Sequence, residues 1–138
     1  MKIVYEARAS ATGGRSGRVR TDDGAIDMNL TLPKALGGAG GPGANPEQLF
    51  ACGYAACFDN ALIHTARQQK LALTDSRVDA TVGIGANDKG GFVLAVTLEI
   101  HLPGLPREQA QALIEQAHAV CPYSNAVRGN VDVALVLR

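Results

Sequence analysis

Two of the three cysteines in this chain lie in settings that favour redox chemistry. Cys57 lies inside an apolar run whose pattern predicts a buried helix, and Cys121 directly precedes Pro122 near the end of the chain. A thiol on a regular scaffold, with a second thiol where proline interrupts a helix, is the arrangement expected of a nucleophile and its resolving partner. The alternative for both is a buried cysteine that only packs, as most helical cysteines do.

Two charged residues could activate such a thiol. A buried thiolate needs a cation nearby, and Arg15 lies in a glycine-rich stretch at residues 12–17. Glu47 could hold the Arg15 guanidinium by a bidentate pair. The alternatives are a solvated loop arginine and a first-turn acid that favours the helix dipole.

The spacing of Glu47 and Cys57 limits how they can cooperate. The two residues are ten positions apart, which is about 15 Å along a straight helix. Either the helix breaks near Gly53 or Glu47 serves a site on another subunit, and we favour the second.

Three other patterns carry less chemistry. Cys52 points about 140° away from Cys57 on a helix, so we expect it to be a core residue. His118 and Cys121 could supply two metal ligands, but no CxxC or second histidine cluster completes a tetrahedral site, so no metal is expected. Residues 38–43 fit the G-x-G-x-x-G pattern but lack the adjoining strand and helix that a dinucleotide site requires.

Alternation and turn residues predict three strands at residues 2–10, 18–21 and 26–32, which form a meander. Asn45, Pro46 and Gln48 predict the start of a helix that extends to about Lys70, with Asn45 and Gln48 exchanging capping hydrogen bonds. Strands are then expected at 77–86 and 91–102, a helix from Pro106 to near residue 120, and a last strand at 131–137. The order βββ-α-ββ-α-β indicates one α+β domain, residues 1–138, with a largely antiparallel sheet.

Composition excludes several kinds of partner. The formal net charge is zero, so neither nucleic acid nor an anionic membrane is attracted over long range. No apolar stretch is long enough for a membrane helix, and Glu6 and Arg8 interrupt any signal-peptide segment. We therefore expect a cytoplasmic protein, in which paired cysteines are more often catalytic or metal-binding than structural.

Five strings together resemble a known family. They are residues 11–15 (ATGGR), 36–40 (LGGAG), 45–50 (NPEQLF), 53–58 (GYAACF) and 121–125 (CPYSN). In this order and spacing they resemble the organic hydroperoxide resistance proteins, within the OsmC/Ohr superfamily of bacterial thiol peroxidases. The resemblance spans nearly the whole chain.

The resemblance implies an intertwined α+β homodimer, with sheets wrapped around buried central helices and two sites at the subunit interface. It implies reduction of organic, alkyl and lipid-derived hydroperoxides to alcohols. By the resemblance, Cys57 becomes a sulfenic acid, Cys121 resolves it as a Cys57–Cys121 disulfide, and Arg15 and Glu47 complete the site. No bound metal, flavin or haem is implied, and the external reductant would be a dihydrolipoyl dithiol on a lipoylated protein.

Two alternatives stay open at this point. One is an OsmC-type peroxidase with a broader peroxide preference. The other is a non-catalytic module of the same fold that binds an apolar ligand. Cys52 is a departure from the family, which needs only two cysteines.

Overall fold

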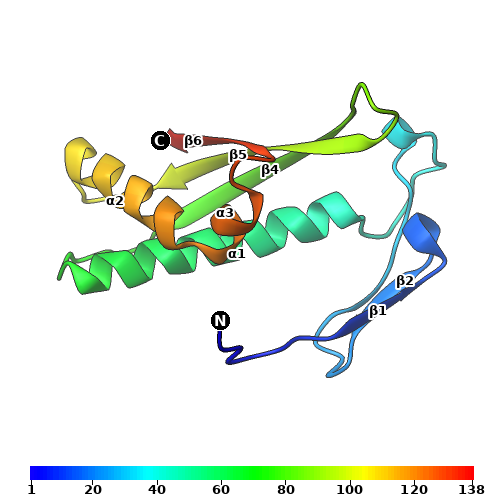
Figure 1. The fold of residues 1–138 in the computed structure, drawn as a ribbon, viewed down its shortest axis with the longest axis horizontal. Helices are drawn as coiled ribbons and strands as arrows, with labels where there is room; N and C mark the ends of the chain where they lie inside the picture. Colours follow the sequence, from blue (N-terminus) through cyan, green and yellow to red (C-terminus); the bar gives the residue numbers. More distant parts are fainter. The chain divides into compact units, whose positions relative to one another are not determined.

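The structure is a computed structural model that describes residues 1–138, and the chain forms two compact units, Met1–Leu49 and Phe50–Arg138. Its elements follow the order (Figure 1) β1 (Ala9–Thr12), η1 (Gly14–Ser16), β2 (Arg18–Thr21), β3 (Asp27–Asn29), η2 (Lys34–Leu36), α1 (Pro46–Gln68), β4 (Arg77–Ala86), β5 (Phe92–His101), α2 (Arg107–Val120), α3 (Pro122–Val127) and β6 (Asp132–Leu137). The α+β class is confirmed, and the predicted order differs by the short helix α3 and the one-turn helices η1 and η2. That residues 1–138 form one domain stays a prediction. No helix of the chain has both the length and the apolar character needed to cross a bilayer.

The first unit contains the predicted meander. Strands β1, β2 and β3 pair antiparallel in that order, with Ala11 opposite Val19 and Val19 opposite Met28. The prediction of a strand over residues 2–10 is wrong for most of its length, because β1 begins only at Ala9. Alternating side chains do not make a strand unless another backbone is there to pair with it, and residues 2–8 belong to no strand.

The start of α1 is confirmed in detail. The backbone amide of Gln48 donates to Oδ1 of Asn45 at 2.9 Å, and the backbone amide of Asn45 donates to Oε1 of Gln48 at 3.0 Å. This reciprocal pair satisfies two amides that would otherwise lack partners at the helix start. The helix then continues without interruption through Gly53, so the alternative of a break there is wrong.

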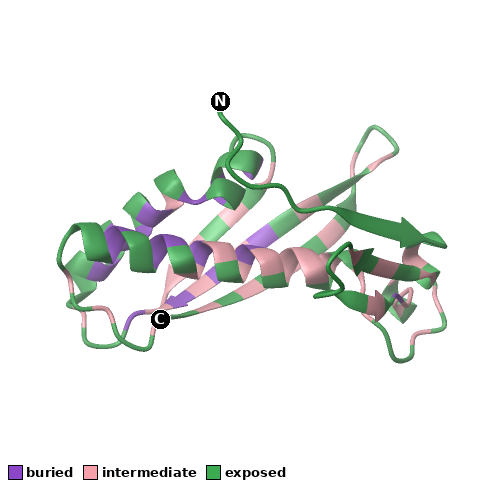
Figure 2. Cartoon of the chain, turned by 90° about the horizontal axis from the view of Figure 1, so that it is seen from below, coloured by how far each residue is buried: buried purple, intermediate pink, exposed green.

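The second unit is a three-stranded sheet with helices on one face. The strand order is β4-β5-β6, with β4 antiparallel and β6 parallel to β5. The central strand β5 buries Val96, Leu98 and Ile100 on one face, where they pack in one core with residues of α1 and α2. Figure 2 shows buried stretches of helix and strand in purple. Because successive strand residues face opposite sides, Thr97 and Glu99 lie on the other, more exposed face.

Helix α1 is only half buried in the single chain. Its buried residues recur at helical spacing along one face: Tyr54, Phe58, Ala61, Leu62, Thr65 and Ala66. The expectation that Cys52 is a core residue is wrong for this chain, since Cys52 is exposed. Ala56 and Ile63 are exposed beside it, which leaves an apolar stripe on α1 uncovered.

The prediction that proline interrupts a helix beside Cys121 is confirmed, but a second helix follows at once. Cys121 ends α2 and at once precedes α3, in which Pro122 occupies the first turn. Proline suits that position because its missing N–H is not needed there. The Cys121 amide donates to the Ala117 carbonyl at 2.8 Å, and the Cys121 carbonyl accepts from the Asn125 amide at 2.9 Å. The backbone of this α2–α3 joint is therefore held on both sides.

Candidate active site

The second unit brings the two predicted redox cysteines together. The Cys121 thiol donates to the sulfur of Cys57, with 3.5 Å between the two sulfur atoms, and both cysteines are free thiols. Cys57 is half-buried on α1, and Cys121 is completely buried in the core. A disulfide needs about 2.05 Å between its sulfur atoms, so an approach of roughly 1.5 Å would join them.

The environment of Cys57 within this unit disfavours its thiolate. Burial raises the pKa of Cys57 above its usual value, and the neighbouring Cys121 raises it further. The backbone amide of Tyr123 acts in the opposite direction and lowers it. No cation of Phe50–Arg138 is among the groups that shift this pKa, and a positive charge close to the sulfur would lower it.

Aromatic rings surround this part of α1. The Tyr54 ring meets Phe50 edge-on at 6.1 Å, and the ring of Tyr123 lies 5.8 Å from that of Tyr54. Tyr123 also packs directly over Gly53, where an added Cβ would come within 2.8 Å of the tyrosine oxygen. Gly53 therefore gives Tyr123 room to lie against the helix beside the thiol pair.

A buried polar network near the cysteines was missed by the sequence analysis. The Tyr54 hydroxyl and Ser124 Oγ lie 2.9 Å apart, and Ser124 Oγ lies 2.9 Å from Nδ1 of His118. Burial raises the pKa of Tyr54, which keeps the phenol protonated, and burial with the positive charge of Arg128 lowers the pKa of His118, which keeps its ring neutral at pH 7. The sequence analysis considered His118 only as a possible metal ligand and Ser124 only as part of residues 121–125, and nothing in the spacing linked either residue to Tyr54.

The first unit contains the other predicted pair. Arg15 donates from Nη1 to Oε2 of Glu47 at 2.7 Å and from Nη2 to Oε1 at 2.6 Å, a bidentate arrangement. The hydrogen bonds from Arg15 lower the pKa of Glu47 and raise that of Arg15, so both groups stay charged near neutral pH. The Arg15 side chain keeps 35% of its surface exposed, against 13% for Glu47.

The backbone around Arg15 explains the glycines that flank it. Arg15 lies in the one-turn helix η1, which Gly13 enters at φ 71° and Gly14 continues at φ 55°. A side chain at Gly17 would run into the carbonyl oxygen of Thr12. These positive φ angles and this close approach need glycine, so the sequence folds here into a tight turn that presents one arginine.

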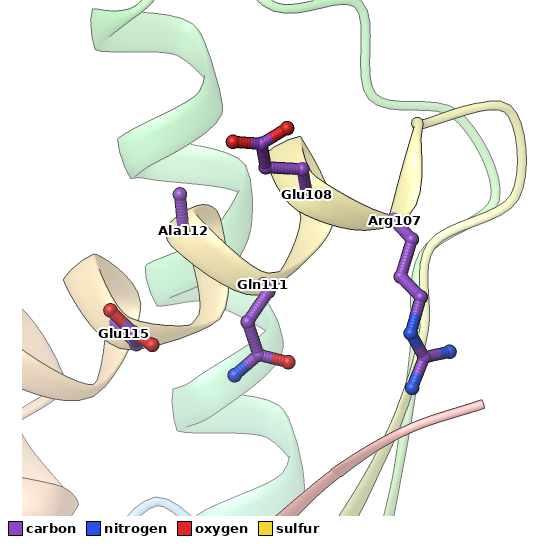
Figure 3. Close-up of a pocket in the computed structure, with 5 residues that line it drawn as sticks. All are labelled: Arg107, Glu108, Gln111, Ala112 and Glu115. Carbon is purple, nitrogen blue, oxygen red and sulfur yellow. The ribbon is translucent and has the colours of Figure 1, made fainter.

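The four predicted site residues thus form two pairs, Arg15 with Glu47 in the first unit and Cys57 with Cys121 in the second. A surface hollow on α2 contains none of them: Figure 3 shows it lined by Arg107, Glu108, Gln111, Ala112 and Glu115. All five are exposed and their charges are mixed, so the hollow offers no enclosed site. No three His, Cys, Asp or Glu side chains gather where they could hold a metal ion.

Known proteins resemble this chain over nearly its full length. An organic hydroperoxide resistance protein from Xanthomonas axonopodis pv. citri is 53% identical over 137 residues, covering 99% of this chain and 96% of the relative. The organic hydroperoxide resistance protein OhrB of Bacillus subtilis is 46% identical over 136 residues, covering 98% of each.

Solved structures agree with the sequence matches. The crystal structure of OhrB from Bacillus subtilis superposes with a TM-score of 0.92 at 46% identity and covers 99% of this chain and 100% of its own. An organic hydroperoxide resistance protein from Legionella pneumophila reaches a TM-score of 0.95 at 50% identity, with 99% and 98% covered. The family described as OsmC-like protein matches residues 37–136. The chain therefore belongs to the OsmC-like family, with the fold of the organic hydroperoxide resistance proteins.

Proposed function

We propose that this chain is a thiol-dependent peroxidase that reduces organic hydroperoxides to alcohols. The observation that carries the proposal is the 3.5 Å separation of the Cys57 and Cys121 sulfur atoms, two residues 64 positions apart in the sequence. Relatives named for organic hydroperoxide resistance support a role in peroxide detoxification.

In the first step the Cys57 thiolate attacks the distal oxygen of the hydroperoxide. The O–O bond breaks, an S–O bond forms, and the alkoxide takes a proton and leaves as the alcohol. The sulfur is oxidised by two electrons to a sulfenic acid. Arg15, oriented by Glu47, supplies the positive charge that favours the thiolate and the leaving alkoxide.

In the second step the Cys121 thiol condenses with the Cys57 sulfenic acid. A disulfide forms and water leaves, with the thiol proton carried off on the hydroxyl group. An external dihydrolipoyl dithiol on a lipoylated protein then reduces the disulfide by exchange, becoming a cyclic disulfide itself. No bound cofactor takes part.

The surroundings of the thiol favour apolar peroxides. On α1, the ring of Phe50 packs against Tyr123, and Phe58 lies buried in the next turn beyond Tyr54. An alkyl group that binds against apolar side chains is removed from water, which makes binding more favourable. Hydrogen peroxide has no alkyl group and so gains no affinity in this way. An alkyl or lipid-derived hydroperoxide is therefore the substrate class that we propose.

We further propose that the protein acts as a homodimer. The exposed stripe of Cys52, Ala56 and Ile63 on α1 supports this, because a second copy would cover it. Glu47 lies ten residues before Cys57 on one uninterrupted helix, about 15 Å along its axis. We therefore assign Arg15 and Glu47 of one subunit to Cys57 of the other.

Thiol counting after one equivalent of organic hydroperoxide tests the proposal. The wild-type protein should fall from three free thiols to one, with Cys57 and Cys121 joined in peptide maps, and dihydrolipoamide should restore both thiols. Cys57→Ser should keep both of its remaining thiols. Cys121→Ser should lose one thiol and form a dimedone adduct at Cys57.

Other outcomes would point elsewhere. Three thiols that persist through an excess of cumene hydroperoxide would contradict a peroxidase and favour a binding module. A dimedone adduct at Cys52 would overturn the assignment of Cys57. Equal kcat/KM for hydrogen peroxide and cumene hydroperoxide would indicate a broader peroxide preference.

A further inference from the structure

We propose that Tyr54, Ser124 and His118 form a positioning network that holds Cys121 against Cys57 and so makes the disulfide-forming step fast. The inference rests on the proposed function, because it concerns the step in which the two sulfur atoms join. It assigns a role to three side chains that take no part in the chemistry itself.

Ser124 is the centre of the network. Its Oγ lies 2.9 Å from the Tyr54 hydroxyl and 2.9 Å from Nδ1 of His118. Ser124 and Tyr54 have no exposed surface, and His118 is half-buried against the ring of Phe58. Both hydrogen bonds therefore lie largely away from solvent, where water does not compete for them.

The two hydrogen bonds join the helices that carry the two thiols. Tyr54 lies three residues before Cys57 on α1, so their side chains lie on neighbouring turns of one face. Ser124 lies three residues after Cys121, within the first turn of α3. The bond between Tyr54 and Ser124 is thus a direct link between the turn that precedes one sulfur and the turn that follows the other.

The bond to His118 fixes the α2–α3 joint. His118 belongs to the last turn of α2 and Ser124 to α3, so their hydrogen bond spans the α2–α3 joint at Cys121. Arg128 spans the same joint, donating to the His118 carbonyl at 2.6 Å and to Oδ1 of Asn125 at 2.6 Å. Hydrogen bonds from Ser124 and Arg128 to His118 therefore connect the residues on either side of Cys121 and hold it in place.

The polarity of the network indicates that its geometry matters. Burying a hydroxyl costs free energy unless it is hydrogen-bonded, and an apolar pair of similar shape can replace such a pair at little cost. Phenylalanine and alanine would fill the places of Tyr54 and Ser124. Directional hydrogen bonds give a fixed distance between the helices, which apolar packing specifies less sharply.

That distance is what disulfide closure requires. Condensation of the Cys57 sulfenic acid with the Cys121 thiol forms one S–S bond and releases one water, so the sulfur atoms must come from 3.5 Å to about 2.05 Å. A misplacement of about 1 Å can slow a reaction between positioned groups by up to about 100-fold. Attack on the peroxide by Cys57 forms no bond to Cys121, so the network should act on closure far more than on the attack.

Tyr54→Phe and Ser124→Ala test the network, because each removes one oxygen atom and adds no new bulk. Thr65→Val is the matched control: Thr65 lies on α1, is buried, and its hydroxyl has no hydrogen-bond partner. Two rates are measured in single turnovers with cumene hydroperoxide, sulfenic acid formation by dimedone trapping and its loss to the disulfide. The equilibrium of Cys57 and Cys121 with reduced and oxidised dithiothreitol gives a second measurement that needs no peroxide.

We expect sulfenic acid formation to stay within about twofold of wild type in both variants, while closure slows about 10-fold or more. The dithiothreitol equilibrium should shift toward the thiols by a similar factor. The double variant should be no slower than Ser124→Ala alone, because Ser124→Ala removes both hydrogen bonds, including the only one that Tyr54→Phe removes. Thr65→Val should match wild type throughout.

Closure within about twofold of wild type in both variants would overturn the network while leaving the peroxidase proposal intact. Equal slowing of both steps, or equal slowing by Thr65→Val, would also overturn it, because general loosening of the core would then be the cause. If the wild-type protein forms no Cys57–Cys121 disulfide with cumene hydroperoxide or with oxidised dithiothreitol, the proposed function itself would be contradicted.

Discussion

Oxidation of Cys57 and Cys121 should make the protein markedly more resistant to unfolding. The two cysteines are 64 positions apart, so their disulfide closes a long loop and restricts the unfolded chain. In the chain-entropy treatment a loop of this length raises the free energy of unfolding by about 4 kcal/mol. Strain in the folded state should reduce this stabilisation only slightly, because the sulfur atoms start 3.5 Å apart and need to move only about 1.5 Å.

Urea unfolding of the reduced and oxidised proteins measures this difference. The oxidised sample is prepared with one equivalent of cumene hydroperoxide, and peptide mapping establishes that Cys57 and Cys121 are joined. Cys121→Ser, treated in the same way, cannot close the loop and should gain no stability. Equal unfolding free energies for the two wild-type samples, with the disulfide mapped, would refute the reasoning.

Four further predictions concern the first unit and its connection to the thiols. Arg15→Ala should slow peroxide reduction by orders of magnitude with little change in melting temperature; a near-normal rate would remove its electrostatic role. Hybrid dimers of Arg15→Ala and Cys57→Ser subunits should recover one working site, whereas sites built within one subunit would stay inactive. Glu47→Gln should lower stability by about 1 kcal/mol at pH 7. The pKa of Glu47 is lowered in the folded state, so its contribution is present above the unfolded value near 4.5 and fades as pH falls through the folded pKa; a difference that does not shrink as the pH falls below 4.5 would contradict this. Asn45→Ala should cost about 1 kcal/mol in urea unfolding by removing the cap of α1, with turnover at low urea unchanged.

Local signals in the sequence predicted much of the fold. The reciprocal cap between Asn45 and Gln48 was readable because it depends on residues three apart. The strand at 77–86 and the turn that follows it were readable because alternation and glycine lie within one short window. Opposite charge made the bidentate contact between Arg15 and Glu47 one of several alternatives, and only the family resemblance assigned the two residues, 32 positions apart, to one site.

Features that depend on distant partners were not readable. Residues 2–8 alternate like a strand, but no pattern within them states whether another strand lies alongside. Pro122 was interpreted as a helix stop, although the same residue also suits the first turn of a new helix, and α3 uses it in that way. Ser124 could not be linked to Tyr54, because their hydrogen bond joins residues 70 positions apart.

The parallel pairing of β5 with β6 has a consequence for how the protein becomes active during synthesis. Parallel neighbours must be joined by a crossover, and here the crossover is the segment that carries α2, Cys121 and α3. A nascent chain that lacks Asp132–Leu137 lacks the strand pairing at one end of this segment, so only its contacts with α1 and β5 would position Cys121. We therefore expect the Cys57–Cys121 contact to reach its final geometry only after β6 has paired with β5.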